Sequence, residues 1–173
     1  MKRDMPVYIT TVSTPVGVAT LASDGEKLCG LWLANQKYFG EMGKSSFNAQ
    51  LLGAVKDDLP IFDRARNWLK RYFSGENPAI GEVPLALTGS DFRTRVWHAL
   101  CNIPYGQTIT YGEIAARVGC ISARAAGGAV GHNPISIIVP CHRVVGTDGK
   151  LTGFAGGLDV KARLLELERS VVS

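Results

Sequence analysis

The stretch Ile137-Ile138-Val139-Pro140-Cys141-His142-Arg143-Val144 places a thiol, an imidazole and a guanidinium together at the end of an apolar run. A short run rich in β-branched residues is typical of a buried strand, and Pro140 removes a backbone donor where that strand must end. We therefore expect a strand that holds Cys141 at its exit. Cysteine reacts as the thiolate, whose formation neighbouring cations favour and apolar burial opposes. An inert structural cysteine is the alternative, but the charged neighbours favour a nucleophile.

Directly upstream, the sequence predicts a helix with unusually small side chains. Ser122 is a candidate N-cap for the segment Ala123-Arg124-Ala125-Ala126-Gly127-Gly128-Ala129-Val130. Each glycine in a helix costs about 1 kcal/mol relative to alanine, so a nearly bare helix surface needs a reason. Small residues let a backbone approach another body closely, and Arg124 is the only large side chain of the segment. Close packing against another helix and contact with a nucleic-acid groove both remain open.

Another short helix is expected before this one. Thr110-Tyr111-Gly112-Glu113 has the capping-box pattern, which predicts a helix from Tyr111 to about Val118 that ends at Gly119. Two short helices with a tight, glycine-containing joint are a helix-turn-helix candidate. A further amphipathic helix is predicted over residues 91–100.

The amino-terminal part of the chain follows a different period. Three short β-type runs within residues 7–33 are separated by Pro-Val-Gly and Ser-Asp-Gly turns, which predicts a three-stranded antiparallel sheet. Apolar residues at helical spacing in 61–73 predict a helix whose stripe covers that sheet. Loop chemistry near residues 88–90 predicts two domains, 1–87 and 88–173.

Composition narrows the class of protein further. The 173 residues carry a net charge of +4, so a polyanionic partner is plausible, and no stretch reaches the length of a membrane span. The four cysteines have no Cys-x-x-Cys spacing, which argues against a zinc site and against a disulfide framework. We expect a cytoplasmic protein without metal or organic cofactor and without a membrane partner.

Four motifs together carry a family resemblance: Pro140–Val144, Asn133-Pro134, Ala123-Arg124-Ala125 and Gly156-Gly157-Leu158. The chain resembles the O-6-methylguanine-DNA methyltransferases, which repair alkylated DNA by taking the alkyl group onto their own cysteine. The similarity is strong over about residues 90–168, and the amino-terminal part fits in length and general pattern. It implies an α/β (α+β) fold: an amino-terminal ribonuclease-H-like domain with a small sheet and helix, then a winged helix-turn-helix-like alkyltransferase domain.

The resemblance also implies roles for individual side chains. Cys141 would accept the alkyl group from a flipped guanine, and His142 with Glu168 would form the relay that activates the thiol. Asn133 would brace the turn beside the site. Tyr111 would place its hydroxyl against the base and a nearby phosphate.

The same resemblance implies a DNA surface and a base pocket. Arg124 would fill the gap that the flipped nucleotide leaves in the duplex. The DNA-binding residues would be Tyr111, Ala123, Arg124, Ala125 and Gly128. The residues of the substrate pocket would be Val139, Pro140, Val144, Ala155 and Gly156.

Two positions depart from the family pattern. Ala155 stands where some members carry a hydroxyl that contacts the alkylated oxygen, and Ala126 replaces a bulkier residue. Because Ala155 has no hydroxyl, the resemblance does not predict that substrate contact here. The smaller or less polar pocket edge leaves the preference among methyl, larger alkyl groups and O-4-methylthymine open. Lys161 matches a family lysine, although the sequence alone also fits a solvated helix charge.

Elementary chemistry agrees with the implied relay. Neighbouring side chains of an extended segment point to opposite faces, so Cys141 and His142 would need a turn or a bridging water to cooperate. Glu168, on a helix predicted over about Asp159–Glu168, could orient the imidazole and stabilise its cation. The thioether product is inert, so we expect one turnover per molecule.

Two other functions remain to be weighed. A thiol hydrolase would use Cys141 and His142 for multiple turnovers on an ester or peptide, but such enzymes bring nucleophile and base from separate parts of the chain. A DNA binder without chemistry would have no use for Cys141. We expect double-stranded DNA with O-6-alkylguanine as the partner of a monomer, and leave cooperativity on DNA open.

Overall fold

The structure is a computed structural model that describes residues 7–42, 45–46 and 55–172. Its amino-terminal half is built on an antiparallel sheet in the order β1-β2-β3. The strands are β1 (Tyr8–Thr14), β2 (Gly17–Ser23) and β3 (Leu28–Leu33). Gly17 has a φ of 116°, which glycine adopts without strain, so the tight turn between β1 and β2 is possible. The predicted meander is confirmed.

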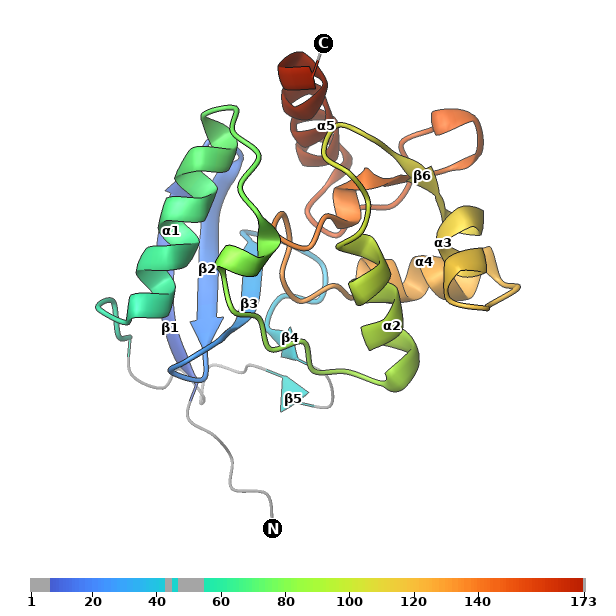
Figure 1. Ribbon diagram of the computed structural model, residues 1–173. Helices are drawn as coiled ribbons and strands as arrows, with labels where there is room; N and C mark the ends of the chain where they lie inside the picture. Colours follow the sequence, from blue (N-terminus) through green and yellow to red (C-terminus); the bar gives the residue numbers. More distant parts are fainter. Residues whose placement is uncertain (1–6, 43–44, 47–54, 173) are drawn as a thin grey trace.

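One helix, α1 (Pro60–Phe73), covers a face of this sheet (Figure 1). It begins where Pro60 at the first helical position supplies a pre-set φ, and it ends near Ser74 and Gly75. Phe62 is buried, and so are the side chains at the predicted three- and four-residue spacing: Ile61, Ala65, Trp68, Leu69 and Tyr72.

The carboxyl-terminal half is mainly helical. The helices are α2 (Asp91–Leu100), α3 (Tyr111–Arg117), α4 (Ala123–Gly131) and α5 (Leu158–Val172). The predicted caps are confirmed: Thr110 and Glu113 form the capping box of α3, and the Ser122 hydroxyl accepts from the Ala125 amide at the start of α4. The last helix continues to Val172, beyond the predicted end at Glu168.

Short elements complete the fold. Strand β6 (Ile109–Thr110) runs parallel to β7 (Val144–Val145) beside α3. The other short elements are β4 (Glu41–Met42), β5 (Ser45–Ser46), and the 3-10 turns η2 (Ile80–Glu82), η3 (Cys141–Arg143) and η4 (Thr147–Gly149).

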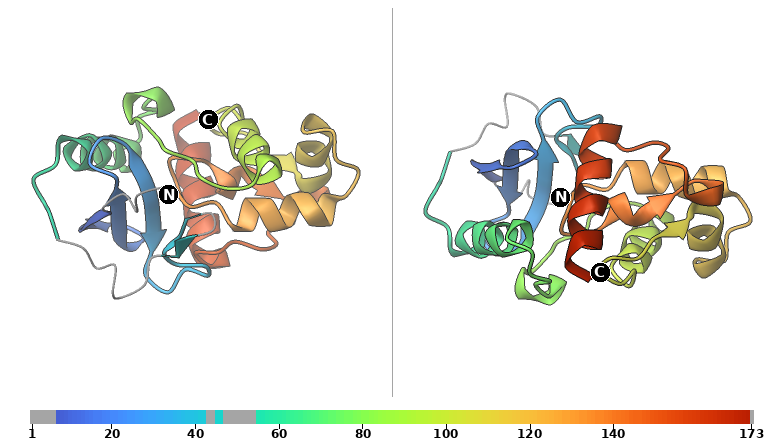
Figure 2. Two further views of the ribbon diagram at one scale, coloured as in Figure 1. Left: turned by 90° about the horizontal axis from the view of Figure 1, so that it is seen from below. Right: turned by 90° about the horizontal axis from the view of Figure 1, so that it is seen from above.

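The two halves share one large hydrophobic core, and a second, small cluster contains Ile9, Ala22 and Trp32. Figure 2 shows the sheet with α1 on one side of α5 and the helices α2 to α4 on the other. The free edge of β3 holds the chain that leads to the reactive motif, since the Leu31 amide donates to Pro134 O (2.8 Å) and the Ser136 amide donates to Leu31 O (3.0 Å). The sheet therefore positions the segment that precedes Cys141.

The predicted strand before Cys141 is wrong. Ile135 makes a single bridge to Leu31, and residues 136–139 form turns and bends. Ile137 even adopts a left-handed φ of 72°, which is uncommon for a β-branched residue. The side chains of this run are buried as predicted, but they are buried by the core between the two halves and not by strand neighbours.

Among the described residues, no helix has the length and apolar character needed to cross a bilayer. The same residues hold no group of three or more His, Cys, Asp or Glu side chains that could bind a metal ion.

Candidate active site

Cys141 begins the 3-10 turn η3 directly after the buried run, and it is 5% exposed. Burial raises the pKa of its thiol. Three influences work against burial and lower it: a hydrogen bond from the Asn133 side chain, the charge of Lys161 and backbone N–H groups of the turn. The η3 turn also supplies the bend that an extended chain would lack, so Cys141 and His142 are not forced to opposite faces.

Asn133 ties the two ends of the preceding turn together. Its Nδ2 donates to Val139 O (2.9 Å), and its Oδ1 accepts from the Ile135 amide (3.0 Å). The side chain is 3% exposed, so these bonds lie in the interior. The Asn133 side chain thus makes hydrogen bonds that a neighbouring strand would otherwise supply to this segment. It also hydrogen-bonds the Cys141 thiol.

His142 and Glu168 form a fully buried pair. Nε2 of His142 hydrogen-bonds Oε2 of Glu168, and both residues are 0% exposed. Because an ionised carboxylate only accepts, Nε2 carries the hydrogen in this pair. Nδ1 is buried and has no hydrogen-bond partner among the described residues. Burial lowers the pKa of His142 more than Glu168 raises it, so the ring is neutral at neutral pH and Nδ1 is ready to accept a proton.

Each oxygen of the Glu168 carboxylate accepts two hydrogen bonds. Oε1 accepts from Arg143 Nε (2.7 Å) and from the Gly106 amide (3.0 Å), while Oε2 accepts from His142 and from the Tyr72 hydroxyl (2.7 Å). Burial raises the pKa of Glu168, but the hydrogen bonds and charges of His142 and Arg143 outweigh it and lower the pKa to about 2. Glu168 is therefore ionised whenever the protein is folded near neutral pH.

Lys161 is buried, contrary to the solvated helix charge that the sequence also allowed. Its ammonium donates to Val144 O and to Thr152 O (3.1 Å), and it lies 3.5 Å from the Tyr111 hydroxyl. Burial lowers its pKa to about 8, against the opposing pull of Cys141. Lys161 thus places a positive charge close to the thiol.

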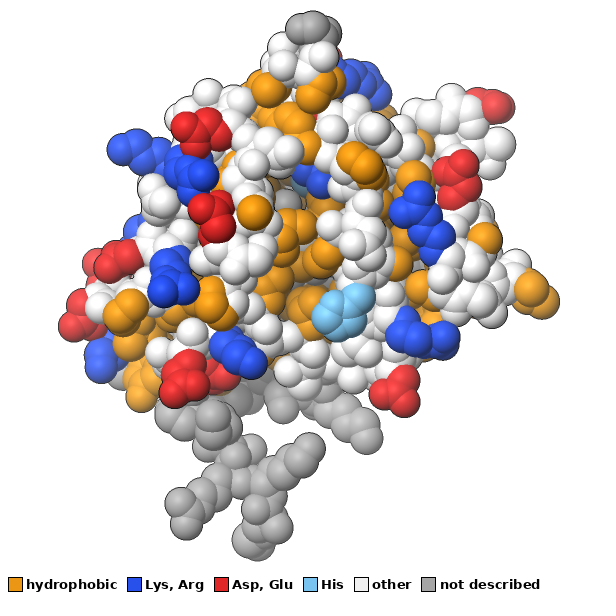
Figure 3. Space-filling model, viewed as in Figure 1, with side chains coloured by type: hydrophobic (Ala, Val, Ile, Leu, Met, Phe, Trp, Pro, Cys, Tyr) orange, Lys and Arg blue, Asp and Glu red, His pale blue; other side chains and the backbone are white. Residues whose placement is uncertain are grey.

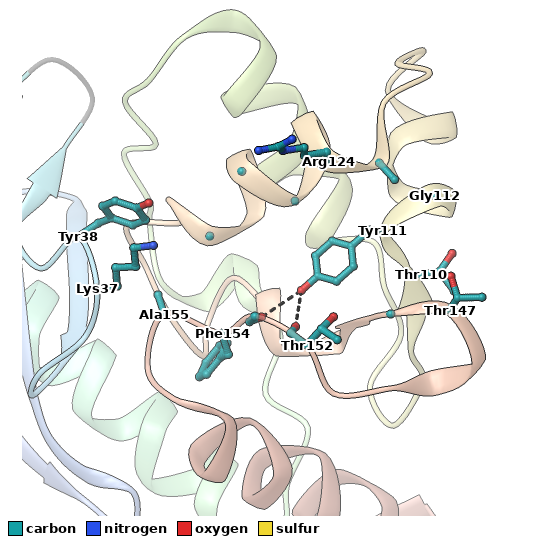
Figure 4. Close-up of a pocket in the computed structure, with 16 residues that line it drawn as sticks. Lys37, Tyr38, Thr110, Tyr111, Gly112, Arg124, Thr147, Thr152, Phe154 and Ala155 are labelled. Atoms are coloured by element: carbon teal, nitrogen blue, oxygen red, sulfur yellow. Dashed lines mark hydrogen bonds between the residues drawn. The ribbon is translucent and has the colours of Figure 1, made fainter.

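A cavity of about 740 Å³ opens next to this cluster, within the range of about 300–1,000 Å³ that is usual for small-molecule sites. Figure 4 shows Tyr111 at its centre, Arg124 on one side and Lys37 with Tyr38 from the amino-terminal half on another. The Tyr111 hydroxyl donates to Thr152 O (2.8 Å) and Gly153 O (3.0 Å). Cys141 is not among the lining residues. Burial raises the pKa of Tyr111 and the charge of Cys141 raises it further, so the thiol lies near one residue of the lining.

The structure divides most of the predicted site residues among a reactive cluster, the cavity lining and the protein interior. The reactive cluster contains Cys141, His142, Glu168 and Asn133. The cavity lining includes Tyr111, Ala123, Arg124, Gly128 and Ala155. Val139, Pro140 and Val144 are buried beneath the site, Ala125 is exposed on α4, and Gly156 follows the lining segment without belonging to it.

Several residues of the site could not be predicted from the sequence. Tyr72 was expected only in the core, because an aromatic at helical spacing gives no hint of a carboxylate partner. Lys37 and Tyr38 line the cavity from a loop that has no chemical motif. Arg143 is a sequence neighbour of the thiol, but no sequence pattern predicts its ion pair with Glu168.

Taken together, these contacts define a class of protein: a buried thiol in the same turn as the imidazole of a buried imidazole–carboxylate pair, next to a pocket walled by a helix-turn-helix. Comparison with known families is consistent with that class. Residues 91–170 match the DNA-binding domain of 6-O-methylguanine DNA methyltransferase, and residues 7–87 match its ribonuclease-like domain. The chain belongs to the 6-O-methylguanine DNA methyltransferase family.

Similar proteins cover nearly the whole chain. A methylated-DNA–protein-cysteine methyltransferase of Mycobacterium tuberculosis is 46% identical over 165 residues, which span 95% of this chain and 93% of that protein. One from Haemophilus influenzae is 42% identical over 164 residues, with 94% and 87% covered. The crystal structure of M. tuberculosis OGT in complex with DNA superposes with a TM-score of 0.79 at 44% identity, covering 95% of this chain and 94% of that one.

Proposed function

We propose that this protein repairs double-stranded DNA by transferring the alkyl group of O-6-alkylguanine irreversibly to Cys141. The observation that carries the proposal is the buried His142–Glu168 pair, whose histidine lies in the turn that also carries the Cys141 thiol, next to a cavity of about 740 Å³ lined by Tyr111 and Arg124. Family membership and relatives named methylated-DNA–protein-cysteine methyltransferase support the same activity.

The proposed reaction is a displacement at carbon. His142 Nδ1 takes the thiol proton, directly or through a water molecule, and Glu168 stabilises the imidazolium that forms. The sulfur of Cys141 then bonds to the alkyl carbon while the carbon–oxygen bond breaks and its electron pair stays on the guanine oxygen. A proton from Tyr111 or from water neutralises the guanine anion, which leaves unmodified guanine and a thioether.

Arg124 supports the proposed access to the base. It is exposed at the first turn of α4, where residues with small side chains leave the helix surface nearly flat. An enzyme that acts on a base inside a duplex must extrude it, and an inserted side chain offsets part of the lost stacking. We propose that Arg124 fills the gap and that the base enters past Tyr111, which must shift for a purine to reach the sulfur.

The proposal also covers the organisation and setting of the chain. Division into domains 1–87 and 88–173 agrees with the two matched ranges, 7–87 and 91–170. A reducing compartment, the cytoplasm, suits a protein whose nucleophile must remain a free thiol, and the four cysteines are all unpaired. A duplex that carries O-4-methylthymine, used in the assay below, tests whether that base is also a substrate.

Mass spectrometry of the peptide that contains Cys141 tests the proposal. After incubation with a duplex that carries one O-6-methylguanine, we expect one methyl group on Cys141 and one guanine restored for each protein molecule. Cys141→Ser should abolish both, whereas Cys101→Ser, at a partly buried thiol outside the cluster, should leave both unchanged. An unmodified Cys141 peptide would exclude repair, and repeated turnover would identify a hydrolase instead.

A further inference from the structure

The amino-terminal half contributes one hydroxyl to the reactive cluster. Tyr72, on α1, is fully buried, and its hydroxyl donates to Glu168 Oε2 at 2.7 Å and lies 3.5 Å from His142 Nε2. Tyr72 and Glu168 are 96 positions apart in sequence, so only the packing of the two halves brings them together.

We infer that Tyr72 is a positioning residue for alkyl transfer, whose hydroxyl fixes the carboxylate oxygen on which His142 depends. The inference rests on the proposed function and assigns a role in it to the amino-terminal half.

The ring of Tyr72 and its hydroxyl serve separate purposes. The ring packs parallel to Trp68 at 5.4 Å between centroids and edge-on to Phe73 at 5.1 Å, contacts that phenylalanine would also make. Among the residues that the structure describes, the hydroxyl hydrogen-bonds only the Glu168–His142 pair. Core packing therefore explains the ring but does not require the oxygen.

A neighbouring tyrosine provides an internal contrast. Tyr105 packs edge-on to Tyr72 at 6.1 Å between centroids, and the Arg143 guanidinium lies over its ring. Its hydroxyl oxygen is buried but has no hydrogen-bond partner among the described residues. Closeness to the cluster is thus not enough to engage the carboxylate, and the bond made by Tyr72 is specific to its position.

The geometry of Glu168 shows what the Tyr72 bond adds. Arg143 and the Gly106 amide hold Oε1, and without Tyr72 the donor to Oε2 among the described residues would be His142 alone. A second donor on Oε2 fixes the plane of the group and hence the direction in which it meets Nε2 of His142. Such outer partners orient the groups that do the chemistry, as they do around metal-bound histidines.

Tyr72 and His142 both donate hydrogen bonds to Oε2 of Glu168, so the two donors compete for the same oxygen. Without that competing donor, the carboxylate would attract an imidazolium more strongly and the pKa of His142 would rise. The other groups that face the pair are Arg143 from η3, Lys161 from α5, Cys141 and Tyr105. All of these remain when the Tyr72 hydroxyl is removed, so a change in the titration of His142 would report on that hydroxyl.

The test compares Tyr72→Phe with Tyr105→Phe in single-turnover methyl transfer across the neutral pH range. For Tyr72→Phe we expect the rate at neutral pH to fall about tenfold, and the acid limb of the profile to move to higher pH because more His142 is protonated. Affinity for the lesion duplex should not change. Tyr105→Phe should keep the rate and the limb of the unsubstituted protein.

A second substitution keeps the inference testable even if Tyr72→Phe folds poorly. Fluorotyrosine at position 72 keeps the hydroxyl and makes it a stronger donor, so the acid limb should move to lower pH, opposite to the phenylalanine variant. An unmoved limb in both variants, whatever their stability, would overturn the inference. Failure of the unsubstituted protein to methylate Cys141 would instead overturn the proposed function.

Discussion

The reactive cluster and the wall of the adjoining cavity are built in opposite ways. Each oxygen of Glu168 accepts two hydrogen bonds, and the donors come from α1, η3 and the loop after α2. The cavity wall includes small residues of α4 and segment 152–155. The Tyr111 hydroxyl and the Lys161 ammonium hydrogen-bond the backbone carbonyls of Thr152 and Gly153. Arg124 is exposed and has no hydrogen bond or ion pair to another described residue.

This difference separates the parts of the protein that can change from those that cannot. A group held by several buried partners cannot be altered without leaving a donor or a charge unsatisfied. A surface of alanines and glycines has few internal partners to lose. Substitutions in the cluster should therefore affect folding and chemistry together, whereas those on the wall should affect recognition alone.

The largest effect is expected from Glu168→Gln, which keeps the shape but leaves the buried Arg143 without its counter-ion. We expect the free energy of unfolding to fall by about 3–5 kcal/mol, measured by urea denaturation. Glu166→Gln, an exposed change on the same helix, should have almost no effect. An equal loss of unfolding free energy in both variants would show that the buried partners of Glu168 do not stabilise the fold.

Acid should weaken the cluster next. The pKa of Glu168 is lowered from 4.5 to about 2 in the folded protein, so its stabilising contribution is complete above pH 4.5 and is lost as the pH falls towards 2. The lowered pKa of His142 acts in the same sense, because the unfolded chain binds that proton more readily. Denaturation curves at a series of pH values should show this slope. A slope between pH 4.5 and 2 that persists unchanged in Glu168→Gln would contradict the assignment.

An intermediate effect is expected from Lys161→Met, because Lys161 lies between the two regions. Loss of its bonds to Val144 O and Thr152 O should lower the free energy of unfolding by about 1–3 kcal/mol. Loss of its charge should also slow alkylation of Cys141 by iodoacetamide, since that charge lowers the thiol pKa. Arg163→Met, on the exposed side of α5, is the matched control. An unchanged rate of Cys141 alkylation would show that the charge of Lys161 does not activate the thiol.

The smallest effect on stability is expected from Arg124→Ala. The free energy of unfolding should change by no more than about 0.5 kcal/mol, as for a surface residue without partners. Repair of O-6-methylguanine in a duplex should nevertheless fall at least about tenfold, while methyl transfer from the free base should not change, because no base has to be flipped. Arg64→Ala, on α1, should alter neither reaction. Equal losses on duplex and free base would contradict the proposed role of Arg124.

The local features of the fold could be predicted from the sequence. Each of these features depends on a few neighbouring residues, so a local sequence pattern predicts it: the caps at Thr110 and Ser122, the apolar stripe of α1 and the turns of the sheet. The helix-turn-helix followed from the same signals. The family motifs led to the reactive residues as well, although their roles stay predictions.

Features that depend on distant parts of the chain could not be predicted. The run before Cys141 is β-branched and buried, but whether such a run is a strand depends on a partner, and β3 offers only one bridge. Lys161 looks like any exposed lysine of an amphipathic helix until the carbonyls of segment 144–153 surround it. The bond from Tyr72 to Glu168 joins residues whose separation no local pattern spans.

The pairing of Leu31 with Pro134 and Ser136 has a consequence for how the chain comes apart. A fragment that began at residue 88 would lose the strand edge that supports this segment and would expose Ile135 and Ile138, both of which are covered in the intact chain. The two halves should accordingly melt in one cooperative transition, and the isolated carboxyl-terminal fragment should aggregate.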